Sequence, residues 1–100
     1  MANVVFHPLA SAEYRASLAW YAARSQRATL GFEREVERIL ATVAVHPLRY
    51  PEYDASCREA ILTRYPYSVI YRIESDGNIL VVAIAHSSRE PGYWLRRTSP

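Results

Sequence analysis

The chain has 100 residues and a formal net charge of +2 at pH 7, and 50% of its residues are hydrophobic, which suffices for one domain, residues 1–100, with its own core. Its only cysteine is Cys57, so an internal disulfide is excluded, and no secretory signal pattern opens the sequence. Because no apolar run approaches the roughly 20 residues that cross a bilayer, we expect a cytoplasmic protein with no membrane partner.

A short strand and a first helix are predicted near the N-terminus. Residues 3–7 are apolar and β-branched, which favours a strand, and Pro8 prevents its continuation. Apolar side chains then recur at spacings of three and four residues, at Ala10, Tyr14, Leu18, Tyr21 and Ala22. This period predicts an amphipathic helix from about Leu9 to Arg27 with one buried stripe, and Glu13 falls outside that stripe.

A second helix is predicted between Thr29, a suitable N-cap, and Pro47, which ends it. Its apolar stripe comprises Phe32, Val36, Ile39, Leu40 and Val43. Because the connection between the two helices is short, they should form an antiparallel hairpin. Residues 47–56 contain two prolines and little periodicity, which indicates a loop, and we expect Tyr50 and Tyr53 to lie back on the core.

Three further strands are predicted at residues 58–63, 67–73 and 78–85. The links between them are short, at residues 64–66 and 74–77, so the strands should form an antiparallel meander. The last strand is apolar on both faces until His86, which predicts a position inside the sheet.

The order of elements is strand, helix, helix, strand, strand, strand. It predicts an α+β fold of two layers, in which an α-helical hairpin packs on one face of a mainly antiparallel four-stranded sheet.

A polar and aromatic tail follows the last strand directly. It carries an imidazole, guanidinium groups, a phenol and an indole, the side chains that recognise or cleave phosphate-rich partners. Each also has a structural interpretation: His86 as a hydrogen-bonded residue at the sheet edge, Arg89 as a partner of Glu90, and Tyr93 and Trp94 as packing aromatics that fasten the tail onto the sheet. Arg96 and Arg97 taken alone suggest solvated side chains.

All twelve basic residues are arginine and none is lysine. An anionic partner explains this composition because the guanidinium fork suits carboxylates and phosphates, and a coding bias explains it equally well. No metal or other cofactor is expected, since His7, His46 and Cys57 are scattered and the glycines form no phosphate-binding loop.

A series of short motifs runs through nearly the whole chain in a fixed order. It comprises residues 6–10 (FHPLA), Trp20-Tyr21, residues 30–32 (LGF), residues 35–37 (EVE), His46-Pro47, Tyr50-Pro51, Arg58, residues 64–67 (RYPY), Ile70-Tyr71 and residues 83–94 (AIAHSSREPGYW). Together these motifs resemble the RelE/ParE family of type II toxin–antitoxin toxins, in particular the ParE-like, plasmid stabilisation type. The resemblance implies the same fold and a toxin that a cognate antitoxin neutralises.

The resemblance leaves two targets, because ParE-like members poison DNA gyrase and RelE-like members cut mRNA on the ribosome. A metal-independent endoribonuclease needs an acid, a base and cations around the phosphorane, for which His86, Arg89 and Tyr93 are the candidates. The positions that align with the basic cluster of the nucleases are Glu59, Ile61 and Ser68, and none is basic. We therefore expect growth arrest through gyrase by a protein that is not an enzyme, with the ribonuclease as the alternative.

Two contact surfaces are predicted. Contacts to the target are assigned to Arg58, Arg64, Arg72, Arg89, Trp94, Arg96 and Arg97. Contacts to the antitoxin are assigned to Leu18, Trp20 and Tyr21 on the first helix, because an apolar helix of the partner would cover them. A homodimer through an exposed strand edge, and an inactive relic that only binds its antitoxin as a corepressor, stay open as further alternatives.

Overall fold

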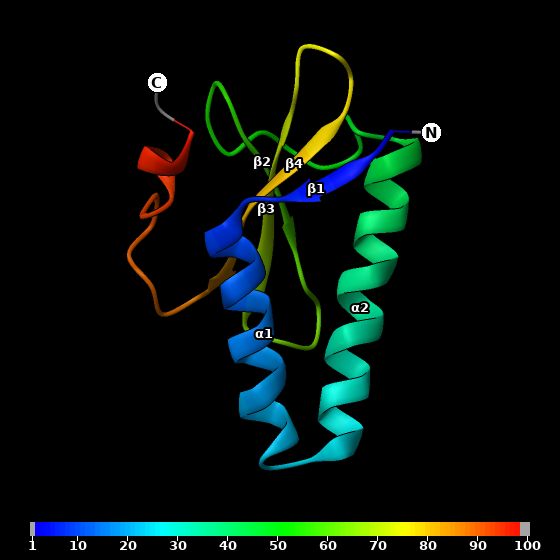
Figure 1. Cartoon of the computed structure of the whole chain (residues 1–100), viewed down its shortest axis with the longest axis vertical. Helices are drawn as coiled ribbons and strands as arrows, with labels where there is room; N and C mark the ends of the chain where they lie inside the picture. Colours follow the sequence, from blue (N-terminus) through cyan, green and yellow to red (C-terminus); the bar gives the residue numbers. More distant parts are fainter. Residues whose placement is uncertain (1, 99–100) are drawn as a thin grey trace.

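A computed structural model describes residues 2–98 of the chain. Its elements are β1 (Val4–Phe6), α1 (Pro8–Ala22), α2 (Gln26–Val45), β2 (Arg58–Ile61), β3 (Tyr67–Ile73), β4 (Ile79–His86) and the short 3₁₀ helix η1 (Leu95–Arg97). Figure 1 shows α1 and α2 side by side in front of the sheet, joined by a tight connection. The predicted α+β architecture with a helical hairpin is therefore confirmed. Within the described residues, no helix has the length and hydropathy needed to cross a membrane.

The helix boundaries differ from the prediction. The imidazole Nδ1 of His7 caps α1 by accepting a hydrogen bond from the backbone N–H of Leu9 at 3.1 Å, and α1 ends at Ala22, before the predicted limit at Arg27. The cap of α2 is Ser25, whose hydroxyl accepts from the N–H of Ala28 at 3.1 Å, and the predicted cap Thr29 lies inside the first turn. Serine is at least as good an N-cap as threonine, and the helix starts from Ser25, four residues before the predicted cap.

The four strands form one sheet in the order β1-β4-β3-β2. The strand β4 lies inside the sheet, as its apolar faces predicted, and pairs antiparallel with β3. It pairs parallel with β1, so the sheet is mixed, and β2, the strand that follows the helical hairpin, lies at the opposite edge from β1.

The main core lies between the helices and the sheet. Phe32, Val36 and Ile39 from α2 are at most 2% exposed and pack with Val69 of β3 and Val81 of β4. Each such burial contributes about 1.5–3 kcal/mol relative to an exposed side chain. The apolar stripe of α2 therefore fixes the helical hairpin on one face of the sheet.

A β-bulge in β4 decides which way His86 points. Ile70 pairs with Ala83 and Tyr71 pairs with Val81, so Val82 has no opposite residue in β3. Strand side chains alternate between the two faces, and the extra residue Val82 reverses this alternation from Ala83 onward. His86 consequently lies on the helix side, where its ring meets that of Tyr67 at 4.9 Å.

The tail covers the other face of the sheet. Trp94 is 3% exposed and packs in a second cluster with Cys57, Ile70, Val82, Ala83 and Ala85. Its ring also meets Tyr53 at a centroid distance of 4.9 Å. Trp94 is therefore a packing residue that fastens the tail onto the sheet. The loop before β2 folds back as predicted, because Tyr53 lies against Trp94 and Tyr50 packs on the helix side of the sheet.

Gly31 permits a close approach between α2 and the turn that connects β2 and β3. The hydroxyl of Tyr65 donates to the carbonyl of Ala28 at 2.9 Å, and a Cβ at Gly31 would overlap that hydroxyl oxygen. Alanine usually stabilises a helix interior by about 1 kcal/mol relative to glycine. Here we expect Gly31→Ala to lower the free energy of unfolding by about 1–3 kcal/mol, measured by urea denaturation, because the overlap displaces Tyr65.

The double variant Gly31→Ala/Tyr65→Phe is the matched control. It removes the overlapping hydroxyl, so the double variant should be more stable than Gly31→Ala alone. A Gly31→Ala protein at least as stable as the wild type would contradict the close approach.

Candidate functional site

Glu13 on α1 holds the C-terminal tail. Its carboxylate accepts hydrogen bonds from the Tyr93 hydroxyl at 2.7 Å and from two nitrogens of the Arg97 guanidinium at 2.9 and 2.8 Å. Both members of the ion pair are shielded, with side-chain exposures of 16% for Glu13 and 11% for Arg97. The sequence indicated a solvated Arg97, which the structure corrects.

The Glu13–Arg97 pair also completes the backbone hydrogen bonding of β4. The register between β1 and β4 ends at Phe6 and Val81, so the edge of β4 beyond that point faces no strand. Glu13 accepts from the N–H of Ile84 at 3.0 Å, and Arg97 donates to the carbonyl of Val82 at 3.0 Å. Two side chains therefore satisfy groups that a longer β1 would have paired.

The electrostatics keep Glu13 ionised and Tyr93 protonated. Burial alone would raise the pKa of Glu13, but hydrogen bonds from Arg97, Tyr93 and the Ile84 N–H lower that pKa below its ordinary value. Burial and the adjacent Glu13 carboxylate raise the pKa of the Tyr93 phenol. At neutral pH the Tyr93 hydroxyl therefore keeps its proton and donates it in the hydrogen bond to Glu13.

A groove of about 470 Å³ lies between α1 and the end of β4. It is lined by Ala16, Ser17, Trp20, Tyr21, Pro66, Tyr67, His86, Ser88 and Arg89, and we call it the α1 groove. The bulge aims His86 into this groove, and small residues of α1 leave space beside the exposed Trp20. Residues predicted to meet the antitoxin and residues predicted to meet the target thus share one groove.

The polar groups of the α1 groove are held in defined positions. His86 Nδ1 accepts the backbone N–H of Ser88 at 3.0 Å, so the neutral ring carries its proton on Nε2. The Arg89 guanidinium lies 3.9 Å from the ring centre of Tyr93 and 3.8 Å from the Glu13 carboxylate, with its side chain 53% exposed. The Glu13 cluster therefore orients Arg89 while leaving it accessible to a partner.

A smaller pocket of about 160 Å³ lies beside the tail, where His86 and Arg89 again contribute. Its other polar side chains include Glu59 and Ser68, two of the positions at which the nucleases carry cations. Ile61, the third position, is 68% exposed. A phosphorane here would meet one arginine and an opposing carboxylate.

Four of the predicted target contacts have largely shielded side chains that interact within the fold. The Arg58 guanidinium donates to the carbonyl of Tyr50 at 2.7 Å, and that of Arg72 pairs with Glu74 at 3.0 Å. Arg97 is bound to Glu13, and Trp94 is buried. The other three are separated: Arg89 lines the α1 groove, Arg64 lines a groove on α2, and Arg96 lies in η1. The predicted contacts therefore do not form one continuous surface.

The predicted antitoxin contacts differ in exposure. Leu18 and Tyr21 pack partly against the helix-side core. Trp20 is 52% exposed, with the Arg24 guanidinium 3.8 Å from its ring centre. Trp20 is therefore the residue of the three that offers most surface to a partner.

The described residues contain no group of three or more His, Cys, Asp or Glu side chains that could hold a metal ion. What the site offers chemically is an oriented arginine, an imidazole and aromatic surface. The role of Glu13 was not predicted from the sequence. The only sequence signal for it is an acidic residue in the N-terminal half of the first helix.

Comparison with known proteins identifies a family and related solved structures. The sequence profile described as "ParE toxin of type II toxin-antitoxin system, parDE" matches residues 4–91. A solved structure, the chromosomal ParDE TA system from P. aeruginosa, matches with a TM-score of 0.71 and 17% identity over 86% of this chain and 96% of that chain. The structural match supports the fold. No curated protein matches the sequence significantly.

Proposed function

The chain belongs to the ParE toxin family of type II toxin–antitoxin systems, and from that premise we propose that a cognate antitoxin neutralises it and that the free toxin arrests growth by inhibiting DNA gyrase. The observation that carries the choice of gyrase is the composition of the pocket around His86 and Arg89. Glu59 and Ser68 occupy positions where a ribonuclease would need cations.

The size of the rate loss expected without these cations favours gyrase inhibition over RNA cleavage. Each electrostatic donor that stabilises a developing oxyanion is typically worth about 10²–10³ in rate. The pocket has Arg89 as its single cation, and the Glu59 carboxylate opposes it. It therefore lacks several of the electrostatic donors that RNA cleavage needs. Tyr93 could protonate a leaving group only after giving up its hydrogen bond to Glu13. His86 and Arg89 alone motivate the ribonuclease as the second candidate, which mRNA cleavage on purified ribosomes would reveal.

Expression of the chain by itself in bacteria tests the toxin activity. We expect growth arrest after induction and recovery when the neighbouring antitoxin reading frame is expressed with it. A gene with an early stop codon is the control for the burden of induction. Unimpeded growth with full-length protein present in the cells would contradict the proposal and would favour the corepressor relic.

Trp20 is the proposed anchor for the antitoxin because it is exposed, aromatic and adjacent to a groove. Trp20→Ala is expected to weaken the toxin–antitoxin complex by about 10–100-fold, as measured by isothermal titration calorimetry. Leu48→Ala is the matched control, because Leu48 is 68% exposed and lies outside the α1 groove. Equal affinities for the wild type and Trp20→Ala would place the antitoxin elsewhere.

A further inference from the structure

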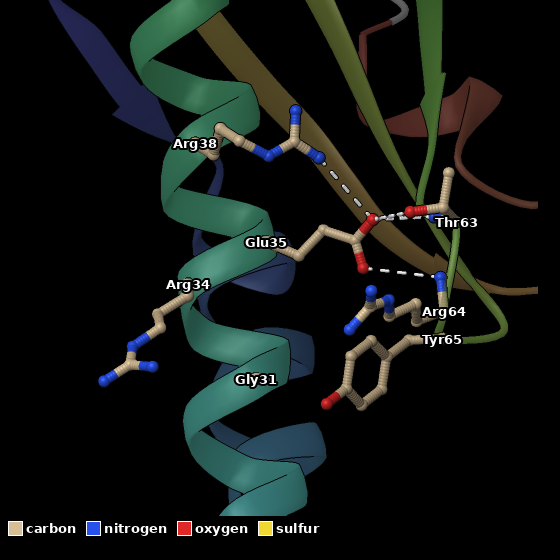
Figure 2. A pocket seen from close by; sticks show the side chains of 7 residues that line it. All are labelled: Gly31, Arg34, Glu35, Arg38, Thr63, Arg64 and Tyr65. Carbon is tan, nitrogen blue, oxygen red and sulfur yellow. Dashed lines mark hydrogen bonds and ion pairs between the residues drawn. The ribbon is translucent and has the colours of Figure 1, made fainter.

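A second groove, of about 440 Å³, runs between α2 and the turn that connects β2 and β3. Figure 2 shows its lining residues, which are Gly31, Arg34, Glu35, Arg38, Thr63, Arg64 and Tyr65. A neighbouring hollow shares four of these residues and adds Ser25, Arg27, Ala28 and Leu30. We call the combined surface the arginine groove, after Arg27, Arg34, Arg38 and Arg64.

The only carboxylate in the arginine groove is already engaged. Glu35 is 9% exposed, and its carboxylate accepts hydrogen bonds from the N–H and hydroxyl of Thr63 and from the N–H of Arg64 (Figure 2). Burial would raise the pKa of Glu35, but these hydrogen bonds lower it below its ordinary value, assisted by Arg38. Glu35 thus anchors the β2–β3 turn to α2, and Arg38 lies 3.6 Å from it with a side chain 62% exposed.

The other arginines of the groove have no acidic partner. Among residues 2–98, no ion pair involves Arg27, Arg34 or Arg64. Arg34 and Arg38 are four residues apart on one helix, a spacing at which like charges oppose helix formation by about 0.2–0.5 kcal/mol. The isolated protein therefore carries an uncompensated concentration of positive charge along the groove.

Two of the three acidic residues of α2 interact with α1 and do not line the groove. Glu33 and Glu37 act on Tyr14 of α1, where they and burial raise the pKa of the phenol to about 12. Two of the three α2 carboxylates therefore lie outside the groove, while Arg27, Arg34 and Arg38 line it. This separation gives the groove a positive field that the net charge of +2 does not reveal.

The shape of the groove favours a row of phosphates. Arg27, Arg34 and Arg38 span about 16 Å along α2 at 1.5 Å per residue, and the Tyr65 side chain lies against Gly31 between them. In Figure 2, Arg38 and Arg64 lie on the side of Glu35, and Arg34 extends away from it. Several cations along one groove suit the repeating charge of a nucleic-acid backbone.

The surroundings favour a duplex over a single strand and over an acidic protein. Tyr65 donates its hydroxyl to Ala28, and its ring packs on Tyr21 and Phe32, so it offers no platform on which bases could stack. A protein partner would need apolar anchors, and the groove offers only Leu30 as an exposed large apolar side chain.

We propose that the arginine groove binds the phosphate backbone of double-helical nucleic acid without reading its sequence. Arg34, Arg38 and Arg64 make the principal contacts, and Glu35 holds the turn that presents Arg64. The binding is independent of the proposed action on gyrase, because it requires only the purified chain and a duplex.

Fluorescence anisotropy with labelled mixed-sequence duplexes in about 0.1 M salt tests this proposal. We expect both duplex DNA and duplex RNA to bind, because only phosphates are contacted, and single strands of the same sequence to bind more weakly. The variant Arg34→Gln/Arg64→Gln should raise the dissociation constant at least tenfold. It should also reduce the dependence of log K on log salt by about 2, roughly 0.9 for each lost phosphate contact.

The matched control is Arg15→Gln/Arg49→Gln, which removes the same charge outside the groove. It should leave the dissociation constant within about threefold of the wild type, since screening limits distant charges at a Debye length of about 10 Å in 0.1 M salt. The absence of duplex binding, an equal loss in both double variants, or binding of one duplex type alone would overturn the proposal. So would polyglutamate that binds the groove and is not displaced by duplex.

Discussion

Replacement of Glu13 by alanine is expected to lower the free energy of unfolding by about 3 kcal/mol and to release the tail from the sheet. The substitution leaves Arg97, which is 11% exposed, without its counter-ion. It also removes the acceptor for the Tyr93 hydroxyl and for the N–H of Ile84, and each unpaired buried group carries its own desolvation cost.

Urea denaturation gives the change in stability, and tryptophan fluorescence reports the tail. In a Trp20→Phe background Trp94 is the only tryptophan, so its emission should shift to the red when Glu13→Ala frees it from the second cluster. Glu90→Ala is the matched control, because it removes an exposed tail carboxylate that makes no ion pair within the described residues. An unchanged emission and stability for Glu13→Ala would show that Glu13 does not hold the tail.

The effect of Glu13 should depend on pH in a defined direction. Its pKa is lowered from the ordinary value of 4.5 by folding, so its contribution is complete above that value and is lost as the pH falls through the lower pKa of the folded state. The stability difference between the wild type and Glu13→Ala should therefore stay constant from neutral pH down to about 4.5 and shrink below it. A difference that stays constant down to the acid transition would contradict the assigned ionisation.

Truncation of Trp94 is the second change with a large expected effect. Trp94→Ala should lower the free energy of unfolding by about 3–5 kcal/mol, because Trp94 is 3% exposed and fills the second cluster between Tyr53, Ile70 and Val82. Urea denaturation measures this cost, and a loss below about 1 kcal/mol would contradict the assignment of the tail as part of the core.

Trp94→Phe separates the packing of the ring from its polar group. The indole N–H is buried and has no hydrogen-bond partner among the described residues. Phenylalanine keeps an aromatic ring and removes the unpaired donor, so this variant should lose much less stability than Trp94→Ala. A Trp94→Phe protein as unstable as Trp94→Ala would mean that an unrecognised hydrogen bond, and not the ring, supports the tail.

The sequence allowed a correct prediction of the elements that are determined by local features, such as a hydrophobic pattern, a proline or a glycine. Alternation and the apolar stretch at 79–85 placed the last strand inside the sheet, and Pro8 marked the end of the first strand. Gly77, with a φ of 87°, lies in the predicted turn before that strand. The predicted start of the second helix was less accurate because Ser25 and Thr29, four residues apart, can both cap a helix.

The geometry of the site depended on contacts between distant residues, which local patterns do not contain. Both faces of β4 are apolar, so the alternation could not reveal the extra residue at Val82 that turns His86 towards the helices. Glu13 and Arg97 are 84 positions apart, and each alone resembles a solvated charge. Their association follows from the short β1, which leaves the edge of β4 to be completed by side chains.

The resemblance identified from the motifs is confirmed by the family match over residues 4–91. The roles of individual site residues stay predictions. His86, Arg89 and Trp20 line one groove, whereas Arg97 and Trp94 are engaged in packing the tail. The accessible residues of the groove are therefore the ones to vary first for target binding. Variants of Arg97 or Trp94 would mix a loss of function with a loss of the tail.

Inhibition of purified DNA gyrase tests the central claim most directly. The reaction combines gyrase, relaxed plasmid, ATP and increasing amounts of the purified chain, and agarose gels report the supercoiled product. The proposed function predicts a dose-dependent loss of supercoiling that the cognate antitoxin reverses. Complete supercoiling in the presence of excess folded chain would contradict gyrase as the target, and cleavage of mRNA on ribosomes by the same preparation would assign the ribonuclease activity instead.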